Sequence, residues 1–193
     1  MSKAEERDVL RVPLAELSPV MLACLEQGQE VILTVTGNSM RPFLRHGKDQ
    51  VVLVRAVPES LMPGDVPFYR RRDGHFVLHR IVARDDGEHR YVLGEAQPGP
   101  SVMPGLHYTL LGDAQTTLEP GIEPDQILAR AQAFIVRGKR TECDSPAYRR
   151  RTLRWHRLMR YRMKLIFLCM LPERAVRKCR RILTGGSKER ADG

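Results

Sequence analysis

The pattern of hydrophobic and polar positions predicts one short helix followed by β-strands. Residues 13–28 predict the helix, with Ser18-Pro19 as its N-cap and first-turn proline and Gly28 at its end. Its apolar positions are Val20, Met21, Leu22 and Leu25. The β-branched, apolar run at 31–36 then predicts a strand.

Six further strand-like runs follow, each bounded by turn signals such as Pro-Gly or Asp-Gly. They cover residues 50–57, 65–70, 75–83, 90–93, 107–111 and 127–136, and the last could instead begin as a short helix. Many short strands with frequent turns predict a compact, mostly antiparallel β fold.

The composition changes after residue 138, and residues 149–183 become rich in arginine, leucine and methionine. This stretch predicts a helix in two pieces that is broken at Pro172. We therefore expect an N-terminal helical segment (1–29), a β-rich domain (30–140) and a basic helical tail (141–193).

Composition and charge indicate a globular protein and bear on whether it binds nucleic acid. A hydrophobic content of 42% in 193 residues indicates a globular chain with one real core. The net charge is +9, but residues 148–183 hold 13 of the basic residues and one acidic residue. The basic charge therefore belongs to the tail, and without a recognised reading motif there we do not expect a nucleic-acid partner.

The four cysteines form no C-x-x-C pair and share no metal-ligand spacing with histidines. We expect reduced thiols in a cytoplasmic protein, with no metal and no cofactor. The first ten residues are charged, which argues against a secretory signal. The longest apolar run of the tail, at 165–171, is too short to span a bilayer.

Three segments carry candidate chemistry. Ser39 follows the first strand in G-N-S-M-R-P, where Gly37 permits a sharp turn that would expose a nucleophile. His79 interrupts an apolar strand, and histidine is the usual base for a serine because its pKa lies near neutrality. Asp113 ends a strand in L-G-D-A-Q and could orient the histidine, a role for which Glu95 is a rival.

Each segment also has a plainer interpretation. Ser39 could be an ordinary turn serine, His79 a satisfied core or surface histidine, and Asp113 a turn aspartate. Arg80 should point to the face of its strand opposite His79, because side chains alternate along a strand.

Taken in order, G-N-S-M-R-P, P-G-D-V, L-H-R-I-V and L-G-D-A-Q resemble the motif set of signal peptidase I over residues 30–140. The resemblance implies a fold of the signal peptidase and LexA type and an endopeptidase with a Ser39–His79–Asp113 arrangement. It is closest to the histidine-base branch, because residues 76–83 contain no lysine. It also implies peptide or protein substrates, which the serine turn would contact through Gly37, Asn38, Met40 and Pro42.

The chain departs from the family pattern at several positions. Leu111 and Gln115 stand where lysine and asparagine are usual, and Lys48 splits the usual glycine–aspartate pair. Gly37 replaces a residue that in some members supplies a hydroxyl to the oxyanion, so we expect the Ser39 N–H to serve there. Signal peptidases also carry a membrane anchor that is not predicted here. The substrate could therefore be a leader peptide as well as a signal peptide.

A second hypothesis is a regulatory, self-cleaving or peptide-binding module related to LexA-type domains. LexA-like proteins carry a helix-turn-helix ahead of the serine domain, whereas residues 1–29 predict one short helix.

The tail suggests a partner of its own. On a helix, the spacing of Arg154, Arg157, Arg160 and Lys164 places them on one face. An apolar set clusters toward another face: Trp155, Leu158, Met159, Met163 and Ile166. Such a helix is suited to lie in an anionic membrane interface. We therefore expect the protein to bind peripherally to the cytoplasmic face of the membrane. The alternative is a helix that packs on the β domain with its charges solvated.

Overall fold

The computed structural model describes residues 14–170, with side chains described for residues 19–159 and for Tyr161. It divides into two compact units, one reaching Leu153 and the other beginning at Arg154. The first unit thus extends beyond the boundary expected at residue 140 and includes the first turns of the last helix.

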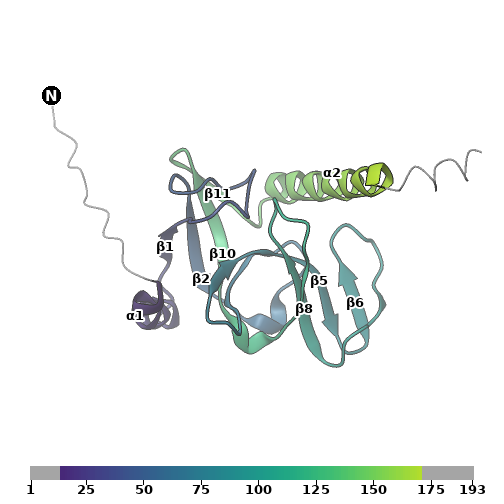
Figure 1. Cartoon of the computed structure of the whole chain (residues 1–193). Helices are drawn as coiled ribbons and strands as arrows, with labels where there is room; N and C mark the ends of the chain where they lie inside the picture. The colour runs from purple at the N-terminus through teal and green to yellow at the C-terminus, as the bar shows by residue number, and fades with distance from the viewer. Residues whose placement is uncertain (1–13, 171–193) are drawn as a thin grey trace, which may run out of the picture. The chain divides into compact units, whose positions relative to one another are not determined.

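The prediction of a mostly antiparallel β fold is confirmed, and the strands form two sheets (Figure 1). The first sheet has the order β1-β2-β10-β3-β4, with β11 also paired to β10. Its strands are β1 Val31–Thr34, β2 Gln50–Arg55, β3 Pro67–Arg70, β4 Phe76–Leu78, β10 Ile127–Val136 and β11 Lys139–Glu142. The second sheet has the order β7-β6-β5-β8-β9. Its strands are β5 Arg80–Asp86, β6 His89–Val92, β7 Gly99–Pro100, β8 Leu106–Leu111 and β9 Glu119–Ile122.

The run predicted as one strand at 75–83 is two strands, one in each sheet. β4 pairs with β3, with Leu78 opposite Phe68, whereas β5 pairs with β8, with Arg80 opposite Leu111. The chain therefore passes from the first sheet to the second at His79. This crossing places His79 where the two sheets meet.

A cluster of buried apolar side chains joins the sheets. Its members come from β3 and β10 of the first sheet, from β5, β8 and β9 of the second, and from the loop after the short 3₁₀ helix Pro58–Ser60. They are Leu61, Tyr69, Ile81, Tyr108, Leu110, Ile122 and Ile127. Burying this surface is the main favourable contribution to holding one sheet against the other.

The N-terminal helix predicted at residues 13–28 is present, but its start is not at Ser18-Pro19. α1 spans Leu14–Glu26, so Ser18-Pro19 do not start it and Pro19 lies inside. A proline inside a helix removes one backbone hydrogen bond while keeping a helical φ, and the helix here continues through it. Met21 and Leu25 are buried on one side.

The alternative of a helical start to β10 is not found. A separate 3₁₀ helix, Pro124–Gln126, precedes the strand, which begins at Ile127.

The first piece of the tail is a long helix, as predicted, although it begins at residue 146 and not at residue 149. α2 spans Pro146–Met170, and its first turns are part of the first unit because Tyr148 and Thr152 are buried. The expected break at Pro172 and the second helical piece lie outside the described residues. Within residues 14–170, no helix is long and apolar enough to cross a membrane.

The core cluster gives a test of the fold. Leu110→Ala should lower the free energy of unfolding by about 2–5 kcal/mol, because Leu110 is fully buried between the sheets. Leu118→Ala is the matched control, because Leu118 is 53% exposed and should change stability by no more than about 0.5 kcal/mol. Urea unfolding with an unchanged m-value would measure both, and equal losses would contradict the described core.

Candidate active site

The turn that carries Ser39 is stabilised by hydrogen bonds to the loop that follows it. Gly37 has a φ of +92°, a conformation that favours glycine, and its N–H donates to His46 Nδ1 at 2.8 Å. The Val35 N–H donates to the carbonyl of Asp49 at 2.9 Å, which closes the loop onto the end of β1. Three hydrogen bonds from Arg45 hold the buried Asp49 carboxylate and lower its pKa to about 2.

The L-G-D-A-Q segment holds the same turn from the other side. The Ala114 N–H donates to the carbonyl oxygen of Ser39 at 2.7 Å. A Cβ on Gly112 would lie 2.9 Å from that oxygen and 2.6 Å from Gln115 Oε1. The absence of a side chain at Gly112 therefore allows two loops that are distant in sequence to pack backbone against backbone.

Ser39 and His79 line one pocket of about 230 Å³. The other lining residues come from the serine turn, from β4, and from the segments that follow β1, β3 and β8. They are Val35, Thr36, Met40, Arg71, Phe76, Val77, Leu78 and Gln115. Among the four expected contact residues of the serine turn, Met40 lines this pocket, whereas Gly37, Asn38 and Pro42 are exposed and lie outside its lining.

The carboxylate beside the buried His79 belongs to Glu119. His79 Nδ1 lies 3.0 Å from Glu119 Oε1 and 3.4 Å from the hydroxyl of Tyr69. Tyr69 donates to Glu119 Oε2 at 2.6 Å, and Arg71 donates to both carboxylate oxygens. Because an ionised carboxylate only accepts, the proton of the neutral imidazole belongs on Nδ1, and Nε2 keeps its lone pair.

Burial and charge together keep this imidazole neutral. Burial lowers the pKa of His79, Glu119 raises it and Arg71 lowers it, and the net value lies below that of an ordinary histidine. Burial alone would raise the pKa of Glu119, but the hydrogen bonds from Arg71 and Tyr69 outweigh it, so the pKa is lowered. At neutral pH the pair is therefore an ionised carboxylate and an imidazole able to accept a proton at Nε2.

Asp113 has a different partner from the one the sequence suggested. Its two oxygens accept from Arg80 Nε at 2.8 Å and Arg80 Nη2 at 2.7 Å. Arg80 also donates to the carbonyl of Gly64 and to the hydroxyl of Tyr148, and it is 1% exposed. His79 and Arg80, although adjacent in sequence, therefore have different hydrogen-bond partners.

Sequence reasoning missed Glu119 because the adjacent Pro120-Gly121 is a turn signal. These residues belong to β9, an edge strand, where a proline is tolerated. A usable signal was the spacing of Tyr69 and Arg71, which places a hydroxyl and a guanidinium on one face and indicates a nearby anion. The rival Glu95 is exposed in the turn after β6.

Within the described part of the chain, no group of three or more His, Cys, Asp or Glu side chains is placed to hold a metal ion. No protein-family model matches the chain, and no curated protein matches it significantly. The function is therefore inferred from the residues and geometry of this site.

The packing of the two loops predicts the effect of a single methyl group. Gly112→Ala should displace the serine turn and cost about 1–3 kcal/mol of stability, because the new Cβ would meet the Ser39 carbonyl. Hydrogen exchange should show a loss of protection at the Ala114 amide, which donates to that carbonyl. Gly99→Ala is the matched control, because nothing lies within 4 Å of its Cβ position. Unchanged protection in Gly112→Ala would show that the loops do not pack as described.

Proposed function

We propose that this protein is a serine endopeptidase in which Ser39 is the nucleophile, His79 the general base and Glu119 the residue that orients the base. The observation that carries the proposal is the shared pocket of Ser39 and His79, together with the Glu119 carboxylate at Nδ1 of the same imidazole. A nucleophile, a base and a third group that orients the base are the elements of a serine triad. The resemblance to signal peptidase I and the mostly antiparallel fold support the same proposal.

The chemistry follows from these positions. His79 Nε2 accepts the proton of Ser39 Oγ as that oxygen attacks the carbonyl carbon of a peptide bond. The Ser39 N–H, which has no acceptor among the described residues, donates to the oxygen that becomes negative. His79 then gives its proton to the leaving amine. Water, deprotonated by the same nitrogen, attacks the acyl ester and regenerates Ser39.

The substrate would lie as an extended strand against a sheet edge. β1 and β4 are the end strands of the first sheet, and the pocket is lined by Val35 and Thr36 after β1 and by Val77 and Leu78 of β4. A free strand edge offers backbone groups to an extended peptide of any sequence. A small side chain beside the scissile bond, as in a signal or leader peptide, is what the resemblance adds.

For the location of the protein, we propose contact with an anionic membrane surface through α2. From Pro146 to Met170 this helix contains no acidic residue. In the second unit Arg154 and Arg157 are exposed, as are Leu158 (52%) and Tyr161 (65%), and their spacing puts all four on one side of the helix. Basic and apolar side chains together favour a lipid interface over nucleic acid, which would leave the leucine in water.

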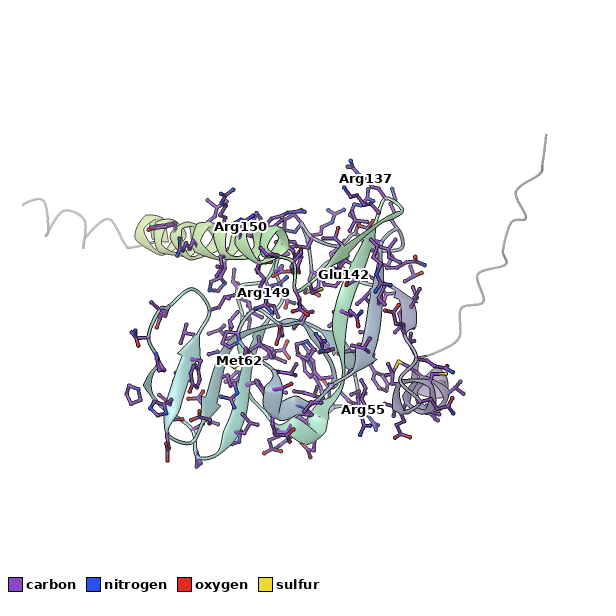
Figure 2. The ribbon with its side chains drawn as sticks, turned by 180° about the vertical axis from the view of Figure 1, so that it is seen from behind. Arg55, Met62, Arg137, Glu142, Arg149 and Arg150 are labelled. Carbon is purple, nitrogen blue, oxygen red and sulfur yellow. The ribbon has the colours of Figure 1, made fainter. Side chains whose placement is uncertain are left out.

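The faces of α2 differ in one respect from the sequence prediction. Leu158 is exposed on the side of the arginines, whereas Trp155 and Met159, which were grouped with it, are half-buried. The side chains of Arg160, Met163, Lys164 and Ile166 lie outside the described ones, although these residues are within α2. Arg149 lies in the first turns of α2, within the first unit (Figure 2). It pairs with Asp144, which comes just before the helix, at 2.7 Å.

The catalytic proposal predicts distinct results for the two carboxylates. In a peptide library analysed by mass spectrometry, Ser39→Ala and His79→Ala should each abolish cleavage, with the double variant no worse. Glu119→Gln should lower the rate on the order of 10²- to 10⁴-fold with little loss of folding. Asp113→Asn should instead cost about 3–5 kcal/mol of stability, because it leaves the buried Arg80 without its counter-charge, and cleavage should persist wherever the variant is folded.

Two outcomes would count against this assignment. Cleavage by His79→Ala at neutral pH would mean that another residue is the base. Specific binding of peptides without turnover, or cleavage only within the protein's own chain, would favour the regulatory or self-cleaving module.

The membrane proposal predicts a loss of binding from two substitutions. Removing the charges of Arg154 and Arg157 (both →Gln) should weaken co-sedimentation with anionic vesicles by roughly 30-fold, at about 1 kcal/mol for each charge. The control Arg55→Gln/Arg72→Gln removes the same charge from exposed positions in the first unit. Equal binding by the two double variants, or no binding by the full chain at low salt, would rule out α2 as a membrane-binding surface. A version ending at residue 140 is a poor control, because it removes the buried Tyr148.

A further inference from the structure

The Arg71 side chain lines the pocket and also forms hydrogen bonds to the Glu119 carboxylate. It follows β3 directly, and its side chain is 35% exposed. Its Nε donates to Glu119 Oε2 at 2.8 Å and its Nη2 donates to Oε1, so the pair is bidentate. A bidentate guanidinium fixes both the position and the plane of a carboxylate, which a lysine ammonium cannot do.

Tyr69 completes this arrangement from inside the protein. It is fully buried, and it stands two residues before Arg71, so both side chains leave the chain on the same face. Glu119 Oε2 accepts from Tyr69 and from Arg71 Nε, whereas Oε1 accepts from Arg71 Nη2 and faces His79 Nδ1. Rotation of the carboxylate would break at least two of these contacts, so Oε1 remains directed at the imidazole.

We infer that Arg71, supported by Tyr69, is a positioning residue that fixes Glu119 against His79 and balances its charge, so that the imidazole stays neutral until it receives the serine proton. This inference rests on the proposed function for its catalytic meaning. The arrangement of the four side chains does not depend on that function.

The electrostatic need for Arg71 follows from the position of His79. A buried imidazole beside an unbalanced carboxylate would be drawn toward its charged form, and an imidazolium cannot act as a general base. The charges that act on the ring are those of Arg71 after β3, Glu119 on β9 and Asp113 after β8, and the Tyr69 hydroxyl lies 3.4 Å from Nδ1. Asp113 is already paired with Arg80, which leaves Arg71 as the cation that balances Glu119.

The signs of the contributions agree with this assignment. Burial lowers the pKa of His79, Glu119 raises it, and Arg71 lowers it again. Loss of the Arg71 charge should therefore raise the pKa of His79, and loss of the Glu119 charge should lower it further. An essential neutral base gives a rate that falls as pH drops through its pKa, so Arg71→Gln should move the acid limb of the pH–rate profile upward.

The test measures the protonation of His79 directly by NMR titration of the full chain carrying Ser39→Ala. In Arg71→Gln the pKa of His79 should rise by about one pH unit, and in Glu119→Gln it should fall. Arg72→Gln is the matched control, because Arg72 is a neighbouring arginine whose exposed side chain pairs with Glu123 at 3.1 Å. It should leave the titration unchanged. The same pKa in Arg71→Gln and Arg72→Gln would overturn the inference.

Arg71→Lys separates charge from geometry and guards against a poorly folded Arg71→Gln. With Ser39 intact, Arg71→Lys should keep the acid limb within a few tenths of a pH unit, since the charge remains. It should lower kcat with little change in KM, since the bidentate hold on Glu119 is lost. An unaltered kcat would contradict the positioning role. If the wild type cleaves no peptide while the NMR shift is present, the proposed function fails and the assignment of Arg71 stands.

Discussion

The buried ion pair between Arg80 and Asp113 is the interaction on which the rest of the structure depends. Arg80 is almost completely removed from water, which is costly for a cation unless its donors are all used. It donates to Asp113, to the carbonyl of Gly64 and to Tyr148, and it lies over the rings of Phe43 and Tyr148. These partners come from four separate parts of the chain, so one guanidinium connects the serine turn, the second sheet and the start of α2.

This pair also fixes the relation between the two catalytic candidates. Arg80 follows His79 directly, at the point where the chain crosses from one sheet to the other. Asp113 lies between Gly112 and Ala114, and these two residues contact the carbonyl of Ser39. The ion pair therefore joins the segment of the base to the segment that supports the nucleophile, and neither of its members lines the pocket.

The two carboxylate–arginine pairs near the site thus have different roles. Asp113 and Arg80 form a buried pair with an architectural role, remote from water. Glu119 and Arg71 form a half-buried pair beside the pocket, where the pKa of His79 responds to their charges. Asp113 also raises the pKa of His79, but it contributes less than Glu119, whose carboxylate lies 3.0 Å from the imidazole nitrogen.

The sequence by itself determined the mostly antiparallel β class of the fold and indicated two members of the candidate site. Alternating and β-branched runs with turn signals located seven of the strand regions, because period-two patterning reflects which face is buried. Ser39 and His79 were recognisable because each breaks a local pattern, one in a glycine-containing turn and the other in an apolar strand. The alternation of side chains also predicts opposite directions for His79 and Arg80, whose hydrogen-bond partners in the structure are different.

Only the tertiary structure decided which carboxylate lies beside the His79 imidazole. The local signal favoured Asp113, which ends a strand in a recognisable motif, over Glu119, which precedes a proline and a glycine. The outcome depends on the split of residues 75–83 between two sheets and on the pairing of β8 with β9, with Leu110 opposite Glu119. Strand pairing between distant segments is set by the burial of the whole core, so a local pattern can propose a charged residue for a site without showing which partner it will meet.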